Sequence, residues 1–432
     1  MNAMIDRFFG VTAGGGTVRT EIVAGATTYL TMAYIAFVNP VILAEAGMDR
    51  GAVFVATCLA AAGATLLMAL WANYPIALAP GMGINAYFTY TVVKGLQYSW
   101  QIALGAVFLS GVLFLLVSLS PLRAWIVDAI PRSQKMAISA GIGLFLGIIA
   151  LKDSGIVAAS PDTLVTLGDL HAPAALLAAC GFVVMVALDR LAVPGALIIG
   201  VLAAAGAGIA FGVSPFFGAV SAPPSLGPTF LAMDLSDATH LGLGTVVFVF
   251  LFVVLFDNTG TLIGVAHRAG LLDAEGRLPR ADRAFATAAL GAIGGAMLGT
   301  SSVTSYIESA AGVKAGGRTG LVGVTVAGLF LLTLFLAPLA HSVPIYATAP
   351  ALLFVACMMA RGFAELDWDD ATEYAPAVVT TLAMPLTFSI ATGIALGFIA
   401  YVAVKLLSGR IAEAGPVMTA LAVLFVLKYA FF

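Results

Sequence analysis

The sequence predicts an all-α membrane protein whose two halves, of seven transmembrane segments each, have opposite orientations. Hydrophobic residues make up 61% of the 432 positions and charged residues only 9%, whereas a soluble domain is about 25% charged. The apolar stretches fall into two groups of seven, separated by one polar connector. The cationic residues are concentrated in alternate loops, as the positive-inside rule predicts for a multi-pass protein.

Each half of the chain contains seven apolar segments, and some of them are short. In the first half they lie at residues 22–44, 52–72, 76–93, 101–120, 134–151, 172–188 and 192–212. In the second half they lie at residues 242–266, 284–299, 303–316, 320–338, 345–360, 374–388 and 390–407. Several are shorter than the roughly 20 residues of a simple span. Short segments interrupted by Gly or Pro, at matching positions in two halves, are typical of transporters built from inverted repeats.

The loop charges predict a cytosolic N-terminus. With this orientation fifteen Lys and Arg residues fall on the cytosolic side, and only Arg50, Lys94 and Lys152 fall outside. Because each half contains an odd number of crossings, the second half is inverted relative to the first.

The chain therefore divides into a series of regions with different expected environments. We expect a cytosolic lead-in over 1–20, a first inverted repeat over 21–215, an extracytoplasmic connector over 216–240 and a second inverted repeat over 241–410. The apolar tail, 411–432, is either an interfacial helix or a packed fifteenth segment.

Composition also excludes several kinds of site. Cys58, Cys180 and Cys357 lie far apart in apolar runs, with neither metal-ligand spacing nor a disulfide framework. The net charge of −3 and the scattered cations argue against a nucleic-acid partner. The Gly-rich stretch "TAGGGTVR" lacks the Lys-Ser/Thr ending of a phosphate loop. We therefore expect no cofactor, no metal and no nucleic acid.

The third and tenth segments share an unusual backbone pattern. In "YPIALAPGMGINAYFTY", Pro75 and Pro80 remove backbone donors and the Gly-Met-Gly trio loosens the chain before a short helix. In "GTSSVTSYIESAAGV", Ser, Thr and Val residues favour an extended start in the same way. Superposing the two stretches places Asn85 on Glu308.

This pattern predicts a site at the middle of the membrane. Unpaired backbone is tolerated at that depth only where protein buries it or a cavity wets it. We expect extended backbone near 77–80 and 300–304, where the two stretches can pair with each other. The short helices that follow then point their N-termini into one pocket.

Two carboxylates lie within apolar segments. Asp257 interrupts "VVFVFLFVVLFDNTGTLIGVA" and Glu308 lies in the tenth segment. A charge in mid-membrane costs a few kcal/mol, so such residues are functional candidates by default. The alternative is a carboxyl that hydrogen-bonds neighbouring helices and binds no ligand. Because no intramembrane Lys or Arg is available as a partner, we expect at least one carboxyl to be protonated.

Four motifs carry a family resemblance that extends from about Gly15 to Arg410. "FDNTGTLIGVA", "TSSVTSYIESAAGV", "NYPIALAPGMGINAYF" and "TTYLTMAYIAFVNP" resemble the nucleobase:cation symporter-2 superfamily, in particular its AzgA-like adenine/guanine/hypoxanthine permease branch.

The resemblance implies a uracil-permease-like fold, with short antiparallel strands in segments three and ten. It also implies a core domain from segments 1–4 and 8–11, a gate domain from segments 5–7 and 12–14, and a homodimer in the cell inner (plasma) membrane.

The family's binding residues are transferred to this chain by motif. The resemblance assigns the acidic residue of segment eight to Asp257, the glutamate of segment ten to Glu308 and the polar residue after the third-segment strand to Asn85. Uracil permeases have a histidine one turn after the acidic residue, where this chain has Thr261. Proton coupling is therefore expected to rest on the carboxylates.

The chemistry of these residues suits a purine nucleobase. A carboxylate accepts two N–H bonds side by side, which matches the edge of guanine or hypoxanthine. We predict that Glu308 hydrogen-bonds the purine and that Asp257 carries the coupled proton. Further polar contacts are expected from Asn85 and from the chain around Met82, Gly83, Thr304 and Ser305. The candidates for ring stacking are Tyr34, Phe37, Tyr87, Phe256 and Tyr306.

Three classes of function remain open. The leading hypothesis is a proton-coupled importer of purine nucleobases that works by alternating access. The second is an anion transporter or exchanger of the same fold. The two carboxylates, which have no basic neighbour in the sequence, argue against this hypothesis. The third is an intramembrane enzyme such as an aspartyl protease, which needs two aspartates close together. The sequence does not decide whether the coupling ion is a proton or sodium. It also does not decide which of adenine, guanine, hypoxanthine and xanthine is the preferred substrate.

Overall fold

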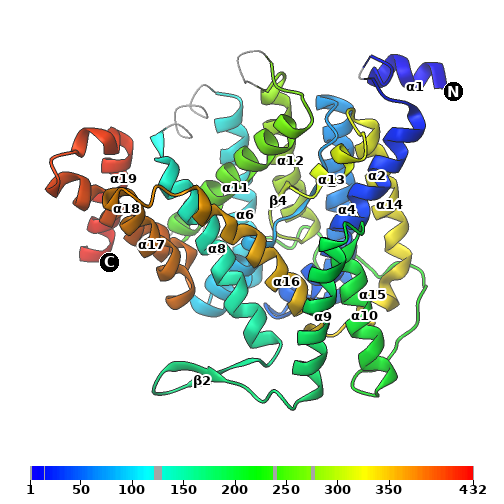
Figure 1. The fold of residues 1–432 in the computed structure, drawn as a ribbon, viewed down its shortest axis with the longest axis horizontal. Helices are drawn as coiled ribbons and strands as arrows, with labels where there is room; N and C mark the ends of the chain where they lie inside the picture. Colours follow the sequence, from blue (N-terminus) through cyan, green and yellow to red (C-terminus); the bar gives the residue numbers. More distant parts are fainter. Residues whose placement is uncertain (1, 14, 121–128, 237–240, 274–277, 432) are drawn as a thin grey trace. The chain divides into compact units, whose positions relative to one another are not determined.

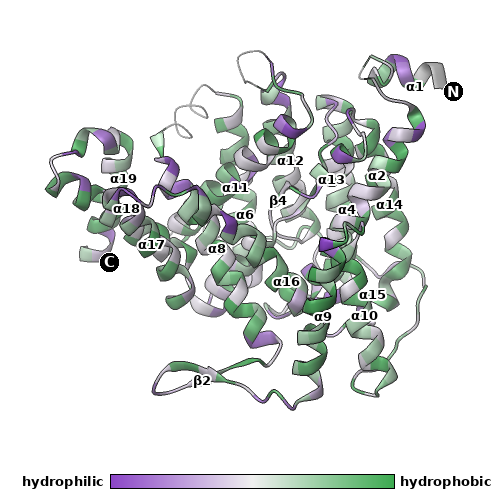
Figure 2. Ribbon diagram, viewed as in Figure 1, coloured by the Kyte–Doolittle hydropathy of each residue, from purple (hydrophilic) through white to green (hydrophobic). Residues whose placement is uncertain are grey.

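The computed structural model describes residues 2–13, 15–120, 129–236, 241–273 and 278–431. This part of the chain is mainly helical, and ten of its helices are long and apolar enough to cross a membrane. Most helices are hydrophobic along much of their length, and hydrophilic residues lie mainly in loops and at helix ends (Figure 2). The protein is therefore a multi-pass membrane protein, as the composition predicts. The count of fourteen crossings stays a prediction.

The chain forms two compact units. The first comprises Met1–Leu119 with Asp153–Ala351, and the second comprises Ser120–Lys152 with Leu352–Phe432. The second unit shares α8 (Arg132–Asp153), α17 (Ala371–Leu386) and α18 (Ile390–Leu407) with the predicted gate domain. In contrast, α9 (Pro173–Arg190) and α10 (Ala196–Ala210) belong to the first unit. The division into core and gate stays a prediction.

The first unit holds the elements of both third- and tenth-segment motifs (Figure 1). Its first-half elements are α1 (Asn2–Phe9), α2 (Val18–Met32), α3 (Ile35–Ala44), α4 (Arg50–Leu67), η1 (Met68–Ala72), β1 (Leu78–Pro80), α5 (Met82–Ala86), η2 (Tyr87–Gly95) and α6 (Trp100–Ser118). They are followed by β2 (Val157–Ser160), β3 (Leu164–Leu167), α9 (Pro173–Arg190) and α10 (Ala196–Ala210). Its second-half elements are α11 (Leu241–Arg268), α12 (Ala281–Leu298), β4 (Val303–Ser305), α13 (Ser309–Lys314), α14 (Leu321–Thr333), η3 (Leu334–Leu336) and α15 (Ala337–Ser342).

The second unit is built on α8 (Arg132–Asp153), η4 (Ala360–Glu365), α17 (Ala371–Leu386), α18 (Ile390–Leu407) and α19 (Ile411–Phe431), while α16 (Ile345–Met359) continues into it from the first unit. The tail that the sequence left undecided is thus helical and packs on α18. Its helix is interrupted at Gly415, where φ is 70°. Its stretch Ile411–Ala430 is long and apolar enough to cross a membrane.

Side-chain caps explain where several helices begin. Thr17 accepts a hydrogen bond from the N–H of Thr20 at the start of α2. Asp49 does the same for Ala52 at the start of α4, at 2.7 Å. Such caps satisfy backbone donors that a helix end otherwise leaves free.

The predicted first segment, 22–44, lies in a single apolar stretch long enough to cross a membrane, Val18–Ala44, which has one local irregularity. Between α2 and α3 the chain tightens, and the N–H groups of Ala36 and Phe37 bond only three residues back, to Ala33 and Tyr34. Pro40 has no N–H to give to the carbonyl of Ala36, which weakens the regular helix here. The irregularity lies at Ala33 and Tyr34, whose backbone stays in the right-handed helical region.

The two extended stretches pair as predicted. β1 and β4 form an antiparallel ladder with Leu78 opposite Ser305, Ala79 opposite Thr304 and Pro80 opposite Val303. The predicted strand positions 77–80 and 300–304 thus agree with the observed strands to within a few residues. In Figure 1, β4 lies beside α11 and α12, which contact it.

The outer edges of this small sheet are satisfied by side chains. Thr65 of α4 accepts from the N–H of Leu78 at 2.9 Å and donates to its carbonyl at 3.0 Å. On the other edge, Asn258 of α11 accepts from the N–H of Ser305 at 2.9 Å. Both side chains are fully buried. The sheet therefore leaves few backbone groups unpaired in an apolar surrounding, which is the condition for extended chain at membrane depth.

Two further elements were not predicted. The hairpin β2–β3 lies in a loop after α8, with Val157 opposite Leu167. Helix α1 occupies part of the predicted lead-in, and Phe9 and Val11 pack against Leu321 of α14.

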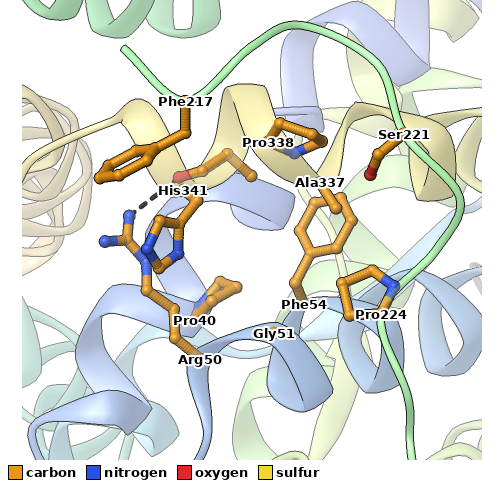
Figure 3. Close-up of a pocket in the computed structure, with 11 residues that line it drawn as sticks. Pro40, Arg50, Gly51, Phe54, Phe217, Ser221, Pro224, Ala337, Pro338 and His341 are labelled. Atoms are coloured by element: carbon orange, nitrogen blue, oxygen red, sulfur yellow. Dashed lines mark hydrogen bonds between the residues drawn. The ribbon is translucent and has the colours of Figure 1, made fainter. Parts of the chain in front are cut away.

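The connector closes over one end of α4 and α15 (Figure 3). Phe217 and Pro224 of the connector line a pocket of about 260 Å³ with residues of these helices. Arg50 donates to the carbonyls of Ala340 and Val343, at 2.9 and 2.6 Å, and so caps the end of α15. Because neither Asp257 nor Glu308 lines this pocket, it is distinct from the predicted purine site.

Candidate substrate site

The predicted site residues come together in the first unit, where four stretches meet. These are the irregularity between α2 and α3, the β1–α5 stretch, the middle of α11 and the β4–α13 stretch. Gly312 makes part of this arrangement possible, because a Cβ there would lie 2.0 Å from Oγ1 of Thr28. A larger residue would therefore push α13 away from α2.

Glu308 lies immediately before α13 and is half-buried. The hydroxyl of Tyr34 donates to its Oε1 atom at 2.9 Å. The hydroxyl of Thr31 also lies 3.4 Å from the backbone carbonyl of Glu308, but its one proton is better placed for the carbonyl of Thr28, at 2.8 Å. The hydrogen bond from Tyr34 is thus the main link between the start of α13 and the first segment.

Asp257 lies in the middle of α11 and is also half-buried. Its hydrogen-bond partner is the side chain of Thr304 on β4. Asp257 and Glu308 are close enough to interact electrostatically. In the described part of the chain, no ion pair joins either carboxylate to a basic side chain. The two groups therefore form an acidic pair without a fixed counter-charge.

The backbone donor expected at Ser305 is already used. Both its N–H and its hydroxyl donate to Oδ1 of Asn258, each at 2.9 Å. The amide nitrogen of Asn258 in turn donates to the carbonyl of Val254 at 2.8 Å. In this structure Ser305 therefore fixes β4 against α11, and its N–H is not free to meet a ring acceptor.

Asn85 is likewise engaged inside the protein. It is fully buried, and its Oδ1 accepts a hydrogen bond from the hydroxyl of Ser301. Its amide nitrogen lies 3.8 Å from the sulfur of Met82. The side chain holds the start of α5 against the stretch that precedes β4, whereas Gly83 is partly exposed.

The aromatic candidates differ in their surroundings. Tyr87 packs edge-on against Phe250, with ring centroids 5.0 Å apart, and Phe256 packs against Phe252 at 4.5 Å. The hydroxyl of Tyr306 donates to the carbonyl of Pro80 at 2.6 Å and so crosses from one strand to the other. Phe37 is 3% exposed, whereas Phe256 is half-buried. Of these rings, Phe256 has the most surface left for a ligand.

Sequence reasoning missed the role of four polar residues. Tyr34 was considered only as a stacking ring, and Thr65 and Asn258 were not recognised as partners of the strand edges. Glu21 is a fully buried carboxylate, which accepts from the N–H of Arg318 at 2.9 Å and from the N–H and hydroxyl of Thr319. A carboxylate at the start of an apolar segment was the available signal for Glu21.

Two short strands that pair between interrupted apolar segments, beside a half-buried acidic pair, indicate a membrane transporter. The chain belongs to the Permease family, whose model matches residues 19–396, and within it to the nucleobase:cation symporter-2 proteins.

The named relatives are permeases, and the chain is accordingly a transporter rather than an enzyme. It is 50% identical to the putative permease MJ0326 of Methanocaldococcus jannaschii, over 99% of this chain and 98% of that protein. It is 45% identical to the adenine permease AdeP of Escherichia coli, over 99% and 96%. It is 44% identical to the guanine/hypoxanthine permease PbuG of Bacillus subtilis, over 98% and 99%.

A solved structure supports the fold class. The transmembrane domain of the cyanobacterial bicarbonate transporter BicA aligns with a TM-score of 0.64 at 15% identity, covering 89% of this chain and 97% of that domain. At this identity the likeness concerns the fold alone. It confirms the predicted uracil-permease-like fold class.

Proposed function

We propose that this chain imports purine nucleobases into the cell, in symport with protons, by alternating access. The observation that carries the proposal is the half-buried pair Asp257 and Glu308, which has no basic partner among the described residues. An acidic pair of this kind favours a neutral ligand rich in N–H donors and disfavours an anion. The relatives named adenine permease and guanine/hypoxanthine permease narrow the ligand to purines.

The two carboxylates have different roles in this proposal. Glu308 accepts a hydrogen bond from a purine N–H, because its Tyr34 contact occupies only one of its two oxygens. Asp257 takes up the coupled proton, because its polar partner is a single threonine and it lies on an otherwise apolar helix. Two carboxylates in one site repel each other when both are ionised. A proton on Asp257 removes this repulsion, and we propose that it thereby favours the state in which both proton and purine are bound.

The same proposal assigns location and assembly. The protein lies in the cell inner (plasma) membrane as a homodimer, with its N-terminus in the cytosol. The positive-inside distribution of the loop cations supports this orientation.

The test is uptake by purified protein in proteoliposomes. Labelled hypoxanthine should accumulate when the outside is more acidic than the inside, and a protonophore should abolish accumulation. A sodium gradient at equal pH on both sides should not replace the proton gradient. Uptake of labelled bicarbonate without uptake of any purine would instead favour the anion exchanger.

A further inference from the structure

Tyr34 holds one particular oxygen of Glu308. Its hydroxyl donates to Oε1 at 2.9 Å. In the described ranges the carboxylate otherwise accepts only from the backbone of Glu308 itself. Oε2 therefore has no hydrogen-bond donor from any other residue of the described chain. A phenol that hydrogen-bonds a carboxylate also draws negative charge towards the oxygen it contacts, which weakens that oxygen as an acceptor for a second donor.

The surroundings of Tyr34 keep this contact in place. The side chain is 1% exposed, so water has little access to its hydroxyl. The tight turn between α2 and α3 fixes its backbone, because Phe37 and Val38 donate to its carbonyl at 3.0 and 2.9 Å. The hydroxyl of Thr31, in the last turn of α2, lies 3.4 Å from the backbone carbonyl of Glu308. The phenol is therefore a fixed partner of the carboxylate.

Purines differ in how many donors they bring to one carboxylate. Guanine presents adjacent N–H groups, at N1 and at the 2-amino group, and gains most from two equally strong acceptor oxygens. Hypoxanthine has only the N1–H on that edge. Adenine has no N1–H and presents its 6-amino group beside a ring acceptor. A carboxylate with one strong acceptor therefore favours a single N–H contact and reduces the advantage of guanine.

We propose that Tyr34 is a specificity-determining positioning residue: it limits Glu308 to one strong hydrogen bond, and so places hypoxanthine and adenine on a par with guanine. This inference rests on the proposed purine transport. It adds a residue of the first transmembrane segment to the determinants of substrate choice.

The experiment is a competition assay with Tyr34→Phe, which removes the hydroxyl and retains the ring. Unlabelled guanine, hypoxanthine and adenine compete against labelled hypoxanthine, both for uptake and for binding to purified protein. We expect the preference for guanine over hypoxanthine to rise about tenfold, because a second charge-assisted hydrogen bond becomes available.

Tyr29→Phe is the matched control. Tyr29 lies on α2, and its hydroxyl contacts Thr333 rather than a carboxylate. It should leave the ratio of the three purines within about twofold of the unaltered protein. A double variant completes the test: in a Glu308→Gln background, Tyr34→Phe should no longer change the ratio, because the two residues act as a pair.

An equal loss of affinity for all three purines in Tyr34→Phe would overturn the proposal, since a merely structural role predicts that result. A change of the ratio that persists in the Glu308→Gln background would overturn it as well. Absence of purine binding and uptake by the unaltered protein would instead refute the proposed function itself, so the two failures are distinguishable.

Discussion

At the scale of single residues, the site illustrates what a sequence motif predicts and what it leaves open. Asp257 and Glu308 were predictable, because a charge inside an apolar segment is costly and rare. The partners of these residues were not, since Tyr34 and Glu308 are separated by 274 positions in the chain. Aromatic residues are common in membrane segments for apolar packing alone, so the hydroxyl of Tyr34 carried no separate signal.

Glu308→Gln should weaken purine binding by roughly ten- to a hundredfold, because a charged hydrogen-bond partner contributes about 1.5–3 kcal/mol. Glutamine keeps the shape but exchanges one acceptor oxygen for a donor. Calorimetry or equilibrium binding on purified, folded protein measures the effect. Binding that is unchanged in this variant would remove Glu308 from the purine contacts.

Asp257→Asn should separate exchange from accumulation. Asparagine can keep the contact with Thr304 but cannot take up or release the coupled proton, so counterflow of purine between the two sides should survive at least in part. Accumulation driven by a pH gradient should be lost. Both are measured in the same proteoliposomes, and accumulation that still follows the gradient would transfer the coupling role to Glu308.

At the scale of elements, the strand pair was predictable and its lateral contacts were not. Prolines, glycines and β-branched residues indicated extended backbone in two apolar segments, and the need to pair backbone groups in the membrane predicted that the strands would meet. Thr65 and Asn258 lie on helices of ordinary apolar pattern, and polarity alone does not reveal which way such a side chain points. The tightened turn between α2 and α3 was also not predicted, because proline is tolerated in transmembrane helices and does not by itself indicate an irregularity.

Thr65→Val should destabilise the first unit by about 2–4 kcal/mol. Valine has nearly the same shape, but it leaves both the N–H and the carbonyl of Leu78 without their partner. Thermal unfolding in detergent measures the loss.

The control for this change is Thr27→Val on α2. Thr27 donates only to the carbonyl of Val23, four residues back, which a regular helix satisfies without it. Its effect should stay below about 1 kcal/mol. Equal destabilisation by the two substitutions would show that the strand edge does not depend on Thr65.

At the scale of the whole molecule, the two units differ in how they place charged side chains. In the first unit, Asp257 and Glu308 have no ion-pair partner among the described residues, although Glu45 of the same unit pairs with Lys94. The second ties three helices together with ion pairs: buried Lys405 on α18 contacts Glu373 of α17 at 2.7 Å and Glu413 of α19 at 2.8 Å. Arg410 extends the network to Asp370 at 2.8 Å. In the sequence, Lys405 lies at the end of the apolar segment 390–407 and its partners lie outside the predicted segments, so only the folded chain brings them together.

Asp370 gives this network a defined pH dependence. Hydrogen bonds from the hydroxyl and N–H of Thr372, and then the Arg410 guanidinium, lower the pKa of Asp370 to about 2 from its usual 3.8. A carboxyl whose pKa is lowered by folding stabilises the folded state above its unfolded pKa. That contribution is lost as the pH falls from about 4 to about 2.

Asp370→Asn should therefore lower the Tm by roughly 1–4 °C at neutral pH, and the difference from the unaltered protein should shrink as the pH falls below 4. Asp369→Asn is the matched control, because Asp369 is exposed, carries the same charge one residue earlier and makes no side-chain contact in the described chain. It should leave the Tm nearly unchanged at every pH. Purine binding should be unaffected in both variants, because Asp370 belongs to the second unit and the binding residues belong to the first. A Tm difference for Asp370→Asn that stays constant down to pH 2 would show that ionised Asp370 does not support the folded state.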